Sequence, residues 1–349
     1  MSEALSSRSV QTDGLYPYQP NKVLPIIFAA LIAFSLALHT YQNFRYRFWR
    51  VTFFMFYAGL VFLCGWILRA ISSHVPSHLG LFIAQTILTY AAPPIYAAAE
   101  YNTLGRLMFY LPMHAPLNPT MVKYFFIYLG SLVEALSGAG AGKLAGSTPG
   151  TARYESGGTL IAVSIVLQGV IECIFMAMVA LIHRRCARAG MLARNVRIVC
   201  LTLYGTSTLV LLRCVFRAVE AFTSYTHSCA EVYCGSVAKN EWYLYAFEAA
   251  PMVLYTLWLN VFHPGRFLPR DYKRFLDIDG ETERIGPGWI DERPKGQIFM
   301  DPFNLQHDAR GSGEHTKFWL RSLDWPACKD GSFALRSASN CGRGEDIGE

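Results

Sequence analysis

Residues 23–41 read VLPIIFAALIAFSLALHTY, an apolar run that contains no acidic or basic side chain apart from one histidine. Six further uncharged or nearly uncharged stretches follow, at 51–71, 79–99, 122–142, 157–182, 198–219 and 242–262. About 20 helical residues cross a hydrocarbon core of roughly 30 Å, and a spanning segment must satisfy its backbone hydrogen bonds internally. The pattern therefore predicts an all-α polytopic membrane protein with seven transmembrane helices.

The composition favours the same class. Hydrophobic residues make up 52% of the chain and charged residues only 16%, which is too apolar for the surface of an ordinary soluble protein. Of 31 basic and 25 acidic residues, 13 and 15 lie after Phe262. The net charge of +6 therefore comes from the loops of the membrane part rather than from a nucleic-acid-binding face, and no nucleic-acid partner is expected.

The basic residues of the loops predict the orientation. The first, third and fifth loops carry ten Lys and Arg residues, whereas the N-terminal segment and the even loops carry five. Because positive loops stay in the cytoplasm, the N-terminus is expected outside and the C-terminus inside. This gives three regions: an extracellular polar tail at 1–22 without a cleavable signal peptide, a seven-helix domain at 23–262, and a cytoplasmic, largely disordered tail at 263–349.

Ionisable and amide side chains within the predicted spans are the candidates for function. A charge at mid-bilayer costs at least ~2.5–3.5 kcal/mol on insertion scales, so such residues face the bundle interior and find partners. In one interpretation, acids and arginines pair to lock the helices together. In the other, some acids bind the cationic head group of an amphiphile or relay protons. The candidates are Glu134, Glu248, Gln85, Gln168, Glu172, Arg213, Arg217, Glu220 and Asn260.

The cysteines and histidines argue against a metal or redox centre. No Cys-x-x-Cys pair occurs, and no three histidines with an acid converge within the spans. The chain has no phosphate-binding GxxxxGK[ST] loop and no nucleophile–base constellation, so we expect neither a cofactor nor an enzyme. Cys229 and Cys234 share the sixth loop, on the oxidising side, where a disulfide between them is plausible.

The order of several short motifs resembles the fungal RTA-like family, also called the lipid-translocating exporter family. The resemblance covers roughly residues 16–269. It is carried by Tyr16-Pro17-Tyr18 with Pro20-Asn21, His39 with Gln42, Gln85-Thr86, Ala91-Ala92-Pro93, Leu104-Gly105-Arg106, Glu134 with Gly138 and Gly140, Gln168, His183-Arg184-Arg185, RCVFRAVE at 213–220, Glu248 with Pro251, and NVFHPGRFLP at 260–269. The family often has Asp where this chain has Glu134 and Glu248, and Glu172 is not one of its signatures.

The resemblance implies a multi-pass protein, in the plasma membrane or in internal membranes. It also implies a role in lipid or amphiphile transport, such as release of sphingoid bases or resistance to toxic amphiphiles, with membrane lipids and an amphiphilic small molecule as partners. A seven-helix sensor of lipids or stress, without transport activity, is the alternative. In that case the basic third intracellular loop at 183–197, or the tail, would contact a cytosolic partner.

Overall fold

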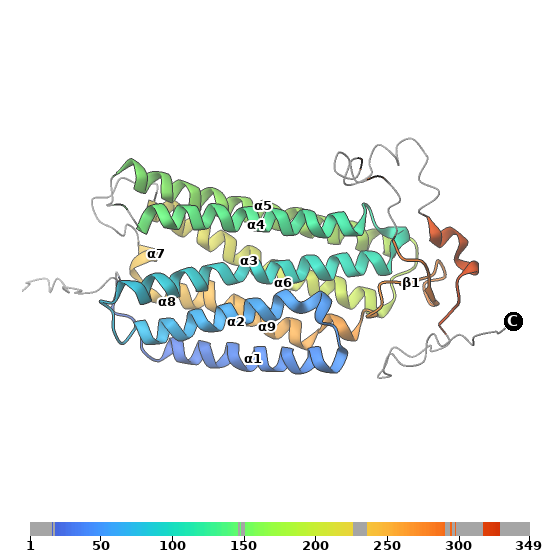
Figure 1. Cartoon of the computed structure of the whole chain (residues 1–349), viewed down its shortest axis with the longest axis horizontal. Helices are drawn as coiled ribbons and strands as arrows, with labels where there is room; N and C mark the ends of the chain where they lie inside the picture. The colour runs from blue at the N-terminus through green and yellow to red at the C-terminus, as the bar shows by residue number, and fades with distance from the viewer. Residues whose placement is uncertain are drawn as a thin grey trace, which may run out of the picture.

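The chain folds into a bundle of long, roughly parallel helices (Figure 1). The computed structural model describes residues 16, 18–145, 147, 151–225, 236–289, 294, 297 and 317–328, so the predicted Cys229–Cys234 disulfide lies outside the described residues. Six unbroken helices are long and apolar enough to cross a membrane. They are α1 (Leu24–Tyr46), α2 (Trp49–Ser72), α3 (Leu79–Tyr110), α4 (Pro119–Ala145), α5 (Ala152–Arg188) and α6 (Arg194–Tyr225).

The seventh predicted span is helical but divided. It consists of α8 (Glu241–Leu244), the π-helical turn η2 (Tyr245–Ala249) and α9 (Ala250–Val261), which follow one another without a gap. Pro251 has no N–H to donate to the carbonyl group of Phe247, so the α-helical hydrogen-bond ladder cannot continue unchanged there. A single π turn absorbs this misfit, and such turns are frequent at functional sites.

The distribution of exposed and buried side chains is the reverse of that in a soluble protein. Phe34 and Val215 are 62% and 63% exposed on the outside of the bundle, whereas Glu248 and Glu172 are fully buried. Water would penalise both arrangements, but lipid favours apolar side chains outside and drives charged groups inward. The predicted class, an all-α polytopic membrane protein, is confirmed.

Helix α3 runs through the middle of the bundle and contacts α2, α4, α5 and α6. Its second half is buried on nearly every face. On one side, α4 and α5 approach each other closely at Gly140, where an added Cβ would lie 2.7 Å from the carbonyl oxygen of Gly157. The small-residue pair Gly138 and Gly142 lies away from this contact, because a Cβ added at either position would meet nothing within 4 Å.

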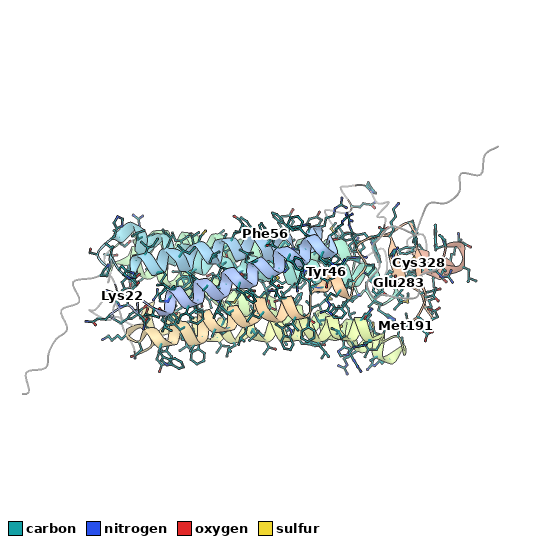
Figure 2. All side chains as sticks on the ribbon, turned by 90° about the horizontal axis from the view of Figure 1, so that it is seen from below. Lys22, Tyr46, Phe56, Met191, Glu283 and Cys328 are labelled. Carbon is teal, nitrogen blue, oxygen red and sulfur yellow. The ribbon has the colours of Figure 1, made fainter. Side chains whose placement is uncertain are left out.

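The chain after Phe262 forms a small folded unit on one end of the bundle. The turn η3 (Pro264–Arg266) leads to the antiparallel strands β1 (Arg274–Leu276) and β2 (Glu283–Ile285), and Ala327, which follows the 3-10 helix η5 (Phe318–Asp324), bridges to Arg284. Figure 2 places Glu283 and Cys328 at the opposite end of the molecule from Lys22. The sequence predicted a tail without a core, whereas these described residues bury Leu268, Phe275 and Leu276.

A buried arginine attaches this unit to the bundle. Arg106, near the end of α3, is fully buried, and its guanidinium group donates to the carbonyl oxygens of Pro269 at 2.8 Å and Asp271 at 2.5 Å. It also lies over the ring of Tyr272. One turn further along, Tyr110 donates its hydroxyl hydrogen to Glu283 at 2.8 Å. The Leu104-Gly105-Arg106 motif therefore has a structural role: it holds residues 269–283 against α3.

Candidate functional site

Four of the candidate residues form one group, which we call the arginine cluster: the buried Arg213, Arg217 and Glu248 and the half-buried Glu220. Arg213 donates to Glu248 at 2.8 Å through both Nε and Nη2. Arg217 forms an ion pair with Glu220, and its Nε lies 4.0 Å from Glu248. The guanidinium group of Arg217 also stacks over Tyr90 of α3, 3.9 Å from the ring centroid.

Local helix geometry explains why these residues meet. Arg213, Arg217 and Glu220 follow one another on α6 at spacings of four and three, which places them on one helix face. Glu248 reaches them from the π turn η2, where the helix is locally wider. Each buried charge has a partner of opposite sign, because an isolated charge in a low-dielectric interior costs several kcal/mol. The cluster joins α6 to the divided helix at the position where that helix is irregular.

Glu134 approaches this cluster from α4. Its side chain is half-buried and interacts electrostatically with Arg213. Within the described part of the chain it forms no ion pair, so no basic side chain holds its carboxylate in place as Arg213 holds that of Glu248. Glu134 is thus a partly accessible acid beside the cluster, on a different helix from its other members.

A second group, which we call the glutamate pair, consists of Glu100 on α3 and Glu172 on α5. Both are buried, at 1% and 0% exposure. Ser207 of α6 donates to Glu100 at 3.0 Å, and Tyr101 donates to Glu172 at 3.5 Å. Gln168 lies one turn before Glu172 on α5 and is also buried. Glu100 was not among the predicted site residues, because the predicted third span ends at Ala99, whereas α3 continues to Tyr110.

Gln85 belongs to a different place, at the end of the bundle that carries Lys22. Its side-chain amide oxygen, Oε1, lies 3.4 Å from Arg69 Nη1. Arg69 of α2 forms a buried ion pair with Glu241 at 2.8 Å and donates to the hydroxyl of Tyr18 at 2.9 Å. These contacts tie α2, α8 and the segment before α1 together. Neither Arg69 nor Glu241 was among the predicted site residues.

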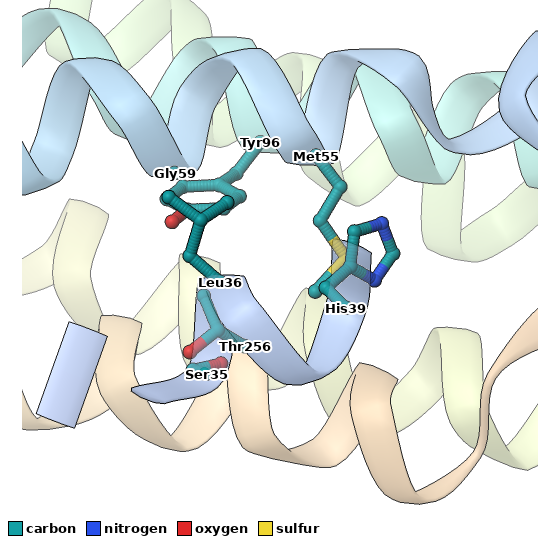
Figure 3. A pocket seen from close by; sticks show the side chains of 7 residues that line it. All are labelled: Ser35, Leu36, His39, Met55, Gly59, Tyr96 and Thr256. Atoms are coloured by element: carbon teal, nitrogen blue, oxygen red, sulfur yellow. The ribbon is translucent and has the colours of Figure 1, made fainter. Parts of the chain in front are cut away.

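Asn260 also lies apart from the arginine cluster and has a structural environment. Its amide nitrogen donates to both the carbonyl and the hydroxyl oxygen of Ser35, and its amide oxygen lies 3.2 Å from His39 Nδ1. It therefore fastens α9 to α1. Figure 3 shows a small cavity beside this contact, lined by His39, Met55 and Thr256 among others.

This cavity is too small for a lipid. Its volume is ≈ 10 Å³, which is room for about one water molecule, whereas sites for small molecules usually enclose about 300–1,000 Å³. His39 Nε2 has no hydrogen-bond partner among the described residues, and a water molecule there would supply one. In the described part of the chain, no group of three or more His, Cys, Asp or Glu side chains is arranged to hold a metal ion.

Comparison with known proteins identifies the family. Residues 55–271 match the family described as RTA1 like protein. A lipid-translocating exporter-like protein RTA1 of Leptosphaeria maculans is 37% identical over 340 residues, which cover 88% of this chain and 65% of that protein. A protein of the same name from Ajellomyces capsulatus is 34% identical over 239 residues, covering 65% of this chain and 72% of its own length.

More distant relatives extend the comparison. The probable lipid transporter atnI of Emericella nidulans is 24% identical over 269 residues, which cover 73% of this chain and 68% of that protein. No solved structure matches the chain. The Leptosphaeria maculans protein is longer than the present chain, which spans 65% of its length. With a family match over more than half of its residues, this chain belongs to the RTA1-like protein family.

Proposed function

We propose that this protein moves single-chain amphiphiles with a cationic head group, such as long-chain bases, across its membrane without enzymatic chemistry. Two observations support the proposal. Relatives in the family are named lipid-translocating exporter-like proteins, and one is named a probable lipid transporter. In addition, the bundle interior holds Glu248 on a π turn between two arginines, with Glu134 half-buried beside them. Glu248 in the arginine cluster is the observation on which the proposal rests most heavily.

The alkyl chain and the head group of the cargo need different surroundings. The alkyl chain is as stable in the surrounding hydrocarbon as in any protein pocket, so only the ammonium group needs a polar path. Glu134 is placed to receive this group from the lipid side of α4. Glu248 would then take it deeper while Arg213 shifts to a new position. Such a path needs no large closed cavity, because the alkyl chain stays in the lipid.

Purified protein in lipid vesicles provides the test, with a fluorescent long-chain base as cargo. We expect Glu134→Gln and Glu248→Gln to slow its movement by about tenfold or more, because each removes a charge interaction worth about 1.4 kcal/mol or more to an ammonium ion in the interior. Glu155→Gln is the matched control, since Glu155 is exposed on the first turn of α5. Equal rates in all variants would refute the assigned site.

The sensor alternative has one specific observation in its favour. The folded unit at 263–289 sits directly on α3, so a change in the bundle could be passed to a cytosolic partner. Arg184, Arg185 and Arg188, at the exposed end of α5, offer such a partner a basic surface. Vesicles that contain only this protein separate the two functions: movement of the cargo requires a transporter, and its absence favours the sensor.

The plasma membrane is the proposed location.

A further inference from the structure

The glutamate pair is the part of the interior that the arginine cluster does not neutralise. Among the described residues, neither Glu100 nor Glu172 forms an ion pair with a basic side chain. The two carboxyl groups are neighbours, because Tyr101, the residue after Glu100, donates to Glu172, and the two glutamates interact electrostatically. Two adjacent carboxylates in a buried, low-dielectric site cannot both stay ionised, as the shared proton of aspartic proteases illustrates. The pair must therefore hold a proton.

The hydrogen bonds indicate where that proton sits. In each glutamate Oε2 accepts a hydrogen bond, from Ser207 in Glu100 and from Tyr101 in Glu172. The other oxygen, Oε1, is buried without a partner in the described part of the chain in both residues. A proton on one of these oxygens removes a buried negative charge and turns an unpaired acceptor into a donor.

An unpaired donor next to the pair points to a further exchangeable group. Gln168 is 7% exposed, lies on the same face of α5 as Glu172 one turn earlier, and its Nε2 has no partner among the residues that the structure describes. Buried amide hydrogens are rarely left unpaired, and an ordered water is the usual missing partner. A water molecule at Gln168 would give the pair a first step for proton exchange.

The other titratable groups around the pair do not supply a positive charge. Tyr101 of α3 and Tyr255 of α9 interact with both glutamates, and the hydroxyl of Tyr255 donates to the carbonyl oxygen of Tyr96 at 2.8 Å. Cys214 of α6 interacts electrostatically with Glu172 and also with Arg213 and Glu248. The glutamate pair and the arginine cluster therefore share Cys214 as a neighbour.

We propose that the glutamate pair is a proton-binding site that couples proton flow to amphiphile movement. The coupling rests on the proposed function, whereas the proton site itself does not. One proton enters from the water on one side and binds a carboxylate oxygen; later the same O–H bond breaks and the proton leaves to the other side. While the glutamate pair holds its proton, Arg213 keeps its ion pair with Glu248. After the proton leaves, the new negative charge attracts Arg213 and frees Glu248 for an ammonium group.

Infrared spectroscopy of the full-length protein in lipid tests the site without any transport. We expect the carbonyl stretch of a protonated carboxylic acid at neutral pH, with the usual downshift in D2O. Glu100→Gln and Glu172→Gln together should remove that component, while the exposed control Glu155→Gln leaves it unchanged. Because Gln has the shape of Glu, monodisperse elution in detergent should be kept and shows that the variants fold. A band of unchanged area in the double variant overturns the proposal.

A vesicle assay with a pH gradient tests the coupling. For one proton per cycle, a gradient of one pH unit should drive accumulation of a fluorescent long-chain base by up to about tenfold. The double Gln variant keeps the pair neutral, so Arg213 should stay with Glu248, and the base should neither accumulate nor equilibrate faster than in vesicles without protein. Accumulation that persists in this variant overturns the coupling through the glutamate pair but not the proposed function. A wild-type protein that moves no base overturns the proposed function and the coupling, and the infrared result then decides whether the proton site stands.

Discussion

The arginine cluster and the glutamate pair both place carboxylates in the bundle interior, Glu248 in one and Glu100 and Glu172 in the other, but they balance their charges in different ways. In the cluster, two arginines face Glu220 and Glu248, so the ionised forms of all four residues stabilise one another. In the pair, Glu100 and Glu172 form no ion pair among the described residues, and they accept hydrogen bonds from the hydroxyl groups of Ser207 and Tyr101. Burial alone therefore does not define a site. Carboxylates that arginines neutralise keep their charge, whereas carboxylates that a proton neutralises change their charge with pH.

The largest expected effect is the difference in protein stability between a variant of the arginine cluster and a variant of the glutamate pair. Glu248→Ala leaves Arg213 without its partner in a dry interior, which should destabilise the protein by about 3–5 kcal/mol. Glu172→Gln replaces a group that shares a proton with a neutral amide of the same shape, and should change stability by less than about 1 kcal/mol. Thermal unfolding in detergent measures both. Similar losses in the two variants would contradict the difference drawn between the groups.

Arg106 provides a third kind of charge balance, since backbone carbonyl groups take the place of carboxylates. Arg106→Ala removes charge-assisted hydrogen bonds to Pro269 and Asp271, each worth about 1.5–3 kcal/mol. We expect residues 263–289 to separate from α3 and become sensitive to protease while the bundle stays intact. Arg266→Ala is the control, because Arg266 makes one exposed hydrogen bond at 3.3 Å. Equal protease resistance in both variants would show that Arg106 does not anchor the tail.

Hydropathy was sufficient to predict the membrane class and the positions of six helices. It was not sufficient for their ends: α3 continues to Tyr110 through the polar residues EYNTLGR at 100–106. A loop and a helix buried by its neighbours look alike in such a stretch, and Glu100 was missed for that reason. The π turn at Glu248 was invisible for a similar reason, because the local sequence reads as an ordinary helix around a proline.

The sequence determines which polar residues meet only within one helix. The spacing of Arg213, Arg217 and Glu220 places them on one face of α6, since one helix fixes their relative positions. Gln85 and Asn260 were grouped with them but lie in separate contacts, with Arg69 and with Ser35. The sequence does not fix how each helix is rotated or how far it is shifted along its axis, and these two variables decide which polar residues meet. Whether the grouped residues bind cargo stays a prediction.

A smaller effect tests the hydrogen bonds of the glutamate pair. Ser207→Ala removes the donor to Glu100 Oε2 and should cost about 0.5–1.5 kcal/mol, the usual net contribution of a buried hydrogen bond. Thr208→Ala, at the exposed neighbouring position, is the matched control and should have little effect. Thermal unfolding in detergent again provides the measurement. A loss as large as that of Glu248→Ala would mean that Glu100 is ionised in the folded protein, contrary to the proton site.

The smallest expected effect concerns an ion pair outside the membrane, between Asp277 and Arg284 at 2.5 Å. Burial alone would raise the pKa of Asp277, but hydrogen bonds from Arg284 and from the backbone N–H of Ile278 outweigh it and hold the pKa below its ordinary value of 3.8. The ionised form is therefore favoured by folding. Its contribution, about 1 kcal/mol or less for a pair in contact with water, is present above the ordinary pKa and is lost as the pH falls through the lowered one.

Hydrogen exchange at the strand residues 274–276 and 283–285, corrected for the intrinsic pH dependence, measures this loss. In the wild type, protection should weaken as the pH falls below 3.8, the ordinary pKa. Asp277→Asn should show slightly weaker protection at neutral pH and no further loss in this acid range, whereas Asp324→Asn, at an exposed position, should follow the wild type. The arginine cluster has the same chemistry without water, so no equivalent loosening is expected there at the same pH. If the cluster and the tail loosened together, water would reach both, and the contrast between the ion pairs inside and outside the bundle would fail.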